Sequence, residues 1–331
     1  MNTFRLLLRS LTFYWRTHVA VLLGVAAGAA VIGGALVVGD SVQASLRKMT
    51  LQRLGDVDYA LSGSRFFTEV LAGRVQTELP ATSDRMTVAP ALSMRGGLTH
   101  TDGETVNRAG GVGVFGVDER LWKLLDRGDV QSPGPGEAVL NSRVADALGV
   151  KVGDDVALNI EVPSAIPRES LLGERNDLTR ELPLTVAAIL PDELGASRFG
   201  LNPSQQIPPV AFVALGDLQN TLDLAAVHPS RRNPAAKPAR VNSLYVGEVA
   251  GPATTQAMDS ADKLTVAVGN VLTLADLGLR IVPVADRGYV SLESTRMILD
   301  DATVDAAHAT VRSLAGDGAT ASPDPPPPTS P

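Results

Sequence analysis

The residues that could carry chemistry are few and widely separated. Three acidic pairs, Asp154-Asp155, Asp192-Glu193 and Asp300-Asp301, match no site motif, and we expect them to be solvated surface charges. A metal centre needs ligands at short, regular spacings, and thiol catalysis needs a cysteine, of which the sequence has none. The histidines show no such spacing and are His18, His100, His228 and His308. The sequence therefore predicts no catalytic, metal-binding or cofactor-binding residues and no enzyme activity.

One glycine pattern could bind a dinucleotide. Gly111-Val112-Gly113-Val114-Phe115-Gly116 matches G-x-G-x-x-G, and Glu137 follows the last glycine by 21 residues. A true fingerprint follows an apolar strand and opens a helix. Residues Thr105 to Gly110 are largely polar, and the glycines fall within a predicted strand, so we expect no dinucleotide site. The sequence also lacks G-x-x-x-x-G-K-[ST], which excludes nucleotide hydrolysis by a P-loop.

An apolar segment near the N-terminus is the strongest feature of the sequence. The 21 residues from Val19 to Gly39 carry no charge. At about 1.5 Å per residue they cover roughly 31 Å, which matches the hydrocarbon core of a bilayer. The apolar core of a signal peptide is shorter, about 7 to 15 residues. We therefore predict a transmembrane helix over residues 19–39.

Two alternatives to a membrane span stay open. The residues Val42-Gln43-Ala44 before Ser45 have the small-residue spacing of a signal-peptidase site, which would make the segment a cleaved leader. The segment could instead be a buried helix of a soluble protein. A helix that is apolar on every face is unusual at the very start of such a chain.

The predicted span is rich in small residues, with five glycines and six alanines between Val19 and Gly39. Small residues let spanning helices approach closely in lipid. We therefore predict a helix-packing interface on one face of the span, formed by the rows Gly24, Gly28, Ala35, Gly39 and Ala26, Ala30, Gly34. The alternative is that glycine and alanine are simply common in spanning helices. The sequence contains no second span, so we expect the partner helices to come from another chain or from a continuation of this one.

The flanks of the span predict its orientation. Residues 1–18 form an amphipathic segment with three arginines, which we expect along the cytoplasmic membrane surface. Long domains cross a membrane largely regardless of their charge, so the part from Asp40 onward is placed outside. The whole chain carries a formal charge of −7, and without the three arginines the remainder carries −10. A nucleic-acid partner is therefore not expected.

A stalk helix is predicted between the span and the rest of the chain, over residues 40–55. Val42, Leu46 and Met49 recur at a helical period that continues to Arg53, and Gly55 is a natural stop. A rigid stalk could transmit displacement. The open alternative is an ordinary amphipathic helix packed on the next domain.

Beyond the stalk, short strands alternate with short helices, which indicates an α+β fold. The Pro- and Gly-rich run Ser132–Gly136 separates two blocks, and the tail Ser322–Pro331 cannot form a helix and is predicted to be disordered. The predicted strands cover residues 57–61, 86–98, 112–117, 137–141, 155–160, 184–190, 210–214, 241–246 and 280–285. The predicted helices cover residues 66–79, 119–126, 142–148, 215–224, 254–274 and 303–314.

Five segments resemble one known family, in order and across the chain to about residue 315. They are Gly39–Leu46, Arg53–Leu61, Glu137–Asn141, Ala147–Val156 and Val241–Val246. Together with the basic start and the small-residue span they resemble the FtsX/MacB-like permeases of ABC transporters. The resemblance implies two mixed α/β lobes outside the bacterial inner membrane. The outer lobe would comprise residues 56–135 and 241–315, and the inserted lobe would comprise residues 136–240. Residues 316–331 would form a separate, disordered Pro-rich tail.

The resemblance also implies partners and a role. These are a cytoplasmic ABC ATPase that binds the ATP, and other permease transmembrane helices in a dimer. The permease would transmit ATP-driven motion to a lipoprotein, peptide or lipid cargo without bond chemistry of its own. Further spans of the family are expected where the tail stands, which suggests a truncated or split subunit. A single-pass membrane-anchored binding or adaptor protein is the main alternative, and an anchored hydrolase the third.

Overall fold

The protein is described by a computed structural model over residues 9–79, 86–125, 130–161, 179–192, 195–201, 206–229, 236–248, 257–284, 289–294, 299 and 301–315. Its helices are α2 (Trp15–Leu54), α3 (Val70–Glu78), α4 (Glu119–Leu125), α5 (Ser142–Leu148), the 3₁₀ turn η2 (Ala196–Arg198), α6 (Leu215–Thr221), α7 (Ala257–Val271) and α8 (Asp301–Ala315). Its strands are β1 (Val57–Thr68), β2 (Met86–Asp102), β3 (Thr105–Val117), β4 (Glu137–Asn141), β5 (Asp155–Glu161), β6 (Thr179–Leu190), β7 (Val210–Ala214), β8 (Arg240–Glu248), β9 (Leu279–Val284) and β10 (Tyr289–Ser294).

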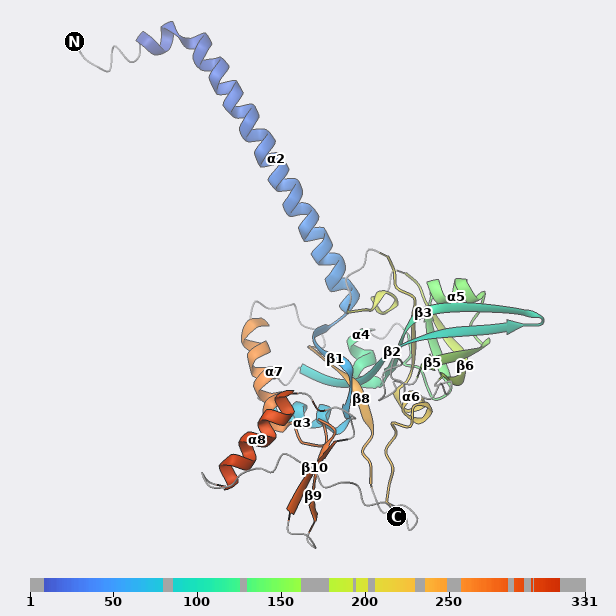
Figure 1. Cartoon of the computed structure of the whole chain (residues 1–331). Coiled ribbons are helices and arrows are strands. Elements are labelled where there is room, and N and C mark those ends of the chain that lie inside the picture. The colour runs from blue at the N-terminus through green and yellow to red at the C-terminus, as the bar shows by residue number, and fades with distance from the viewer. Residues whose placement is uncertain are drawn as a thin grey trace, which may run out of the picture.

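One long helix stands apart from a folded head (Figure 1). Helix α2 is 40 residues long and runs without interruption from the predicted span into the predicted stalk. Residues 9–13 before it are also helical, with a turn at Tyr14. The expected transmembrane and stalk helices are therefore one continuous helix. The remainder of the amphipathic segment, residues 1–8, lies outside the described residues.

A single mixed sheet of eight strands forms the framework of the head, in the order β1-β8-β2-β3-β7-β4-β6-β5. Strand β2 also pairs antiparallel with β5, from Gly96 with Ile160 to Thr99 with Ala157. This second pairing closes six of the strands into a barrel-like ring, with β1 and β8 as an extension. Closure removes the free edges that an open sheet would leave. The α+β class expected from the sequence is confirmed as a mixed α/β domain that contains this barrel-like sheet.

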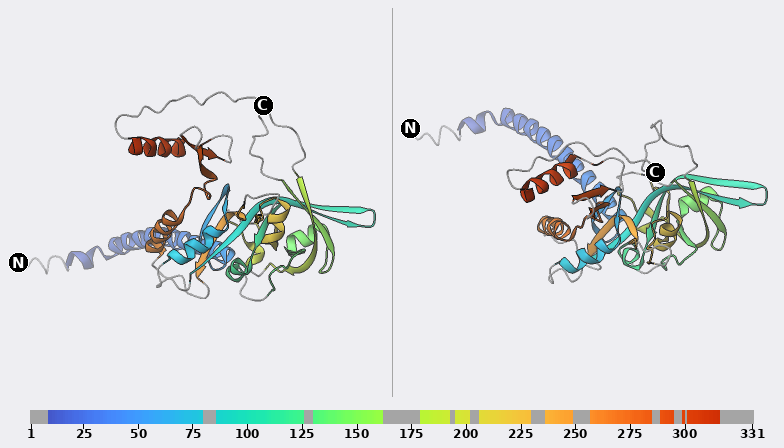
Figure 2. Two further views of the ribbon diagram at one scale, coloured as in Figure 1. Left: turned by 90° about the horizontal axis from the view of Figure 1, so that it is seen from below. Right: turned by 60° about the horizontal axis from the view of Figure 1, so that its bottom comes forward.

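Strands β2 and β3 are long enough to serve both parts of the sheet. The first half of β2 pairs with β8 and its second half with β5, while β3 pairs with β7 from Gly113 onward. The far end of the β2–β3 hairpin projects beyond the barrel in every view (Figures 1 and 2). Strands from both predicted lobes pair with one another in this sheet, as β2 does with β5 and β3 with β7. The lobe boundaries at residues 135 and 240 therefore stay a prediction.

Short amphipathic helices cover the sheet. Helices α5 and α6 bury Leu148 and Leu218 against the barrel core, and α4 buries Trp122 in an aromatic cluster with Phe115 and Phe212. Each helix is too short to be stable by itself and depends on such packing. Helix α5 is capped at both ends, by the Asn141 side chain and by Gly149 in the left-handed region.

The C-terminal part of the head lies outside the main sheet. Helix α7 packs Leu264 and Val268 on the α3 side of the head, against a cluster that contains Leu71 and Val75. Strands β9 and β10 pair only with each other, and α8 follows them (Figure 2).

Several elements differ from the sequence prediction, and two of the differences have a clear physical reason. Residues Phe66 to Thr68 were expected to begin a helix, but they extend β1, where Phe67 pairs with Val241 and Thr68 with Arg240. Residues Thr105 to Gly110, taken as polar and outside the strand, are part of β3 because they pair with the end of β2. In both cases cross-strand pairing overrides local pattern.

Candidate functional site

The membrane segment of α2 is exposed throughout the structure. It is the one described helix that is long and apolar enough to cross a membrane, over Trp15–Lys48. A helix of 40 residues is about 60 Å long, roughly twice the hydrocarbon thickness. About 22 Å therefore remains between the predicted span and the head, contributed by the residues from Asp40 to Leu54.

The predicted packing rows lie on this exposed helix. A Cβ atom added at Gly24, Gly28, Gly34 or Gly39 would meet nothing within 4 Å in the chain. Successive residues of an α-helix are turned by about 100°, which places the row of Gly24 and the row of Ala26 on roughly opposite sides of α2. The rows thus form two faces rather than the single face expected. Whether they pack against other helices stays a prediction.

The stalk residues also lie on exposed helix. Val42 and Leu46 expose 53% and 48% of their surface, which is high for apolar side chains outside lipid. The side chain of Met49 lies outside the described residues. That these residues form a stalk that transmits displacement stays a prediction.

The foot of the stalk is firmly attached to the head. Arg53 is only 8% exposed, and its Nε donates a hydrogen bond of 3.1 Å to the carbonyl of Arg198 in η2. Gly55 ends the helix at φ 62° and ψ −134°, a backbone conformation open essentially to glycine alone. The next amide, of Asp56, donates to the carbonyl of Leu124 in α4 at 2.8 Å. Hydrogen bonds from Arg53 and Asp56, only three residues apart, therefore fasten the helix to the head.

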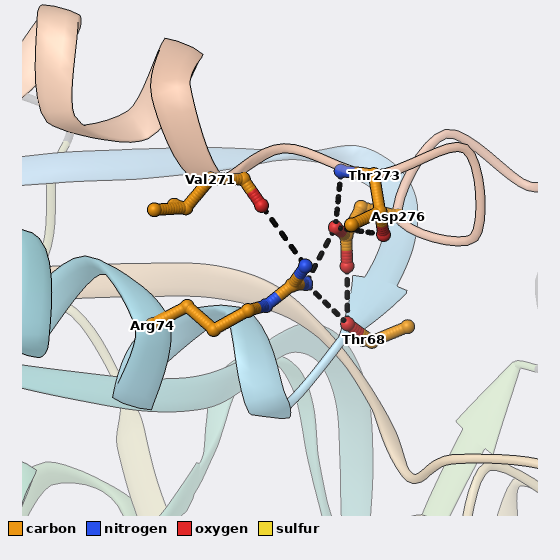
Figure 3. Close-up of polar contacts among 5 residues, drawn as sticks. All are labelled: Thr68, Arg74, Val271, Thr273 and Asp276. Carbon is orange, nitrogen blue, oxygen red and sulfur yellow. Dashed lines mark hydrogen bonds and ion pairs between the residues drawn. The ribbon is translucent and has the colours of Figure 1, made fainter.

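A buried ion-pair network lies in the head (Figure 3). Arg74 of α3 donates to the Asp276 carboxylate at 2.6 Å and to the carbonyl of Val271 at 2.9 Å. Asp276 also accepts hydrogen bonds from the Thr68 hydroxyl and from the amide and hydroxyl of Thr273. Burial raises the pKa of Asp276, but these hydrogen bonds outweigh it and hold the pKa below its ordinary value. The network fastens the C-terminal part of the head to β1 and α3.

The candidate chemical residues do not come together. Gly111, Gly113 and Gly116 lie within β3, as the sequence predicted, and open no helix. The ring of His100 is bonded through Nδ1 to the main-chain carbonyl of Asp155, rather than to a serine or a carboxylate. His228 lies on an exposed loop segment. The arrangement that would favour a hydrolase is not formed by these histidines.

Three residues with structural roles in the head were not singled out from the sequence as site residues. They are Asn141, which caps α5, Arg198, which contacts the foot of α2, and Asp276 of the ion-pair network. A signal existed for two of them. Asn141 precedes a predicted helix, where asparagine is a preferred cap, and Thr273 and Asp276 have capping-box spacing. Arg198 follows no regular pattern and could be found only in three dimensions.

Comparison with known proteins decides the family. The profile of the MacB-like periplasmic core domain matches residues 19–264, well over half of the chain. The chain belongs to this family. The resemblance to FtsX/MacB permeases seen in the sequence is thereby confirmed.

Other comparisons add little. A crystal structure of a domain from a Porphyromonas gingivalis protein, described provisionally as a permease, covers 72% of this chain and 88% of its own length at 10% identity and a TM-score of 0.33. A likeness at this level carries no argument. No curated protein sequence matches this chain.

Family membership places α2 in its context. MacB-like periplasmic core domains belong to ABC-type permeases and are typically non-catalytic. The apolar helix near the N-terminus, together with a periplasmic-type domain, is typical of a membrane-anchored chain with an extracytoplasmic head.

Proposed function

We propose that this chain is a permease subunit of an ABC transporter of the FtsX/MacB type. Its head would transmit ATP-driven motion from the membrane to a lipoprotein, peptide or lipid cargo. A cytoplasmic ABC ATPase would bind the nucleotide, and other permease helices, in a dimer, would surround α2. The bacterial inner membrane is the expected location.

One observation supports this proposal above the others, namely that a single unbroken helix runs from the predicted span to the head. Helices are stiff compared with loops, so a displacement at residue 39 reaches residue 54 with little loss. At the far end, the buried Arg53 and the Asp56 amide tie the helix to two separate elements. An anchor that served only to hold a domain at the membrane would need neither the stiffness nor the double attachment.

The experiment substitutes the small-residue rows with leucine. Gly24→Leu/Gly28→Leu and Ala26→Leu/Ala30→Leu enlarge one row each, and a Cβ atom at either glycine would meet no atom of the described residues within 4 Å. Ala29→Leu is a matched control, because it adds similar bulk about 100° from either row. The tagged full chain is purified from native membranes in mild detergent, and the co-purifying ABC ATPase is measured by its ATP hydrolysis.

We expect at least one row variant to reduce the co-purified ATPase about tenfold, since bulk at a close helix contact prevents association. The Ala29→Leu control should retain it. Purification of the unaltered chain without any ABC ATPase would overturn the proposal and favour the alternative, a membrane-anchored binding or adaptor protein. Full retention in both row variants would show that neither face is the interface.

A further inference from the structure

We propose that the 3₁₀ turn η2 couples the stalk to the barrel, so that a displacement of α2 shifts strands β4 and β7. This inference rests on the proposed function, in which α2 moves. It adds the element through which that motion would enter the barrel. Three groups of contacts meet at η2, and they come from the stalk, from the Asn141 side chain and from aromatic rings.

The first group comes from the stalk. The buried Arg53 donates from Nε to the Arg198 carbonyl, and α2 has further close approaches to η2. Arg198 in turn donates from its own Nε to the carbonyl of Asp192, just beyond the end of β6, at 2.7 Å. A change in the tilt of α2 would therefore act on η2 through Arg53 and on α4 through the Asp56 amide.

The second group comes from the barrel through one side chain. Asn141, at the end of β4, is fully buried, and its Nδ2 donates to the carbonyls of Ser197 at 2.9 Å and Pro208 at 2.8 Å. Its Oδ1 accepts from the amides of Val144 and Val210, both at 3.2 Å. The amide group thus uses all its donors and both acceptor positions.

This saturation makes Asn141 a rigid connector. A buried donor or acceptor that loses its partner costs about 1 to 3 kcal/mol. When η2 shifts, Asn141 therefore follows the Ser197 carbonyl rather than leaving it unpaired. The amides of Val144, in α5, and Val210, at the start of β7, are held by the same side chain and are drawn along.

The third group is aromatic. Phe199, directly after η2, is fully buried and lies 5.0 Å from the ring of Phe115 in β3 and 5.5 Å from the ring of Tyr245 in β8. Close-packed rings leave no free space in which η2 could move alone. The turn is therefore held by the stalk on one side and by strands β3, β4 and β8 on the other.

Hydrogen exchange tests the coupling in the full chain, reconstituted in phosphatidylethanolamine–phosphatidylglycerol nanodiscs. The amides of Val144 and Val210 are measured at single-residue resolution in Arg53→Ala and in Arg47→Ala. Arg47 is the matched control, an exposed arginine on the same helix. Arg53→Ala should speed exchange at both amides about threefold to tenfold, and Arg47→Ala should leave them unchanged.

Coupling is reciprocal, so Asn141→Ser should speed exchange of the Asp56 amide in turn. Faster exchange confined to residues 195–201 in Arg53→Ala, with Val144 and Val210 unchanged, would overturn the proposal. Faster exchange throughout β2 and β8 would reveal that Arg53→Ala unfolds the head. In that case Arg53→Lys is measured instead, and the exchange rates of the Val144 and Val210 amides decide in the same way. The hydrogen-exchange experiment contains no ATPase, so unchanged exchange at Val144 and Val210 would overturn the coupling through η2 but not the proposed function. Conversely, a failure to co-purify an ATPase would overturn the proposed function but not the exchange result.

Discussion

The guanidinium of Arg74 and the carboxylate of Asp276 lie 2.6 Å apart although 202 residues separate them in the chain. The Asp276 side chain is fully buried, whereas that of Arg74 is 28% exposed. The pair joins α3 to the turn between α7 and β9, the point where the C-terminal part of the head returns to the main sheet. This places a structural demand on Asp276 that its local capping-box spacing with Thr273 does not reveal.

We expect Asp276→Asn to destabilise the head. The substitution removes the buried charge that compensates Arg74 and weakens the bonds to Thr68 and Thr273. Because Arg74 keeps partial contact with water, the loss should lie below that of a fully buried pair, at about 1 to 3 kcal/mol. Urea unfolding followed by circular dichroism measures it. Arg280→Gln is the control, since it breaks the exposed Arg280–Glu293 pair and should cost less than about 1 kcal/mol.

The same pair predicts a pH dependence. The pKa of Asp276 is lower in the folded chain than its ordinary value of 3.8. Ionised Asp276 therefore contributes its full stabilisation of the head at pH values well above 3.8. This stabilisation is lost as the pH falls from 3.8 through the lower folded pKa. The difference in free energy of unfolding between the unaltered chain and Asp276→Asn should be constant near neutral pH and shrink in this acid range. A difference that grew on acidification would contradict the assignment.

Local signals were sufficient where one short segment decides the structure. The strand at residues 137–141, the helix at 142–148 and the strand at 210–214 have the predicted bounds. Apolar runs set the strands, and the cap at Asn141 sets the helix start. The span and stalk were predicted for the same reason, since a long helix is encoded in consecutive residues.

Structure that depends on distant partners could not be predicted. The pairing of β2 with β5, which closes the barrel, joins residues about 60 positions apart and leaves no periodic trace in either strand. The joint at the foot of α2 depends likewise on Arg198, 145 residues from Arg53. Gly55 was recognised as a helix stop, but its close approach to α4 became visible only in the fold.

Gly55 should not tolerate a side chain. Its positive φ is strained for other residues, and a Cβ there would lie 2.5 Å from the Leu124 carbonyl oxygen. Gly55→Ala should therefore destabilise the head by roughly 1 to 3 kcal/mol. Gly73→Ala is the matched control, because Gly73 is exposed in α3 with nothing within 4 Å of a Cβ. That substitution should stabilise by about 0.5 to 1 kcal/mol. Equal effects of both changes in thermal unfolding would contradict the proposed strain at the joint.

Tyr245 is a buried residue whose substitution should not destabilise the head. Its side chain is fully buried, and its hydroxyl has no hydrogen-bond partner of normal geometry among the residues that the structure describes. Burial raises the pKa of Tyr245 despite the nearby hydroxyls of Ser243 and Ser93, which lower it. An unpaired buried hydroxyl costs about 1 to 3 kcal/mol, so Tyr245→Phe should leave the free energy of unfolding unchanged or raise it, while keeping the ring packed on Phe199.

Ser243→Ala is the control for Tyr245→Phe. The Ser243 hydroxyl is hydrogen-bonded to that of Ser62 at 2.9 Å and lies 3.2 Å from the Asn242 side-chain oxygen. Its removal should cost about 0.5 to 1.5 kcal/mol. Both variants are compared with the unaltered chain by urea unfolding. A loss above about 1 kcal/mol in Tyr245→Phe would mean that the hydroxyl is paired in solution, because only a satisfied buried group is costly to remove.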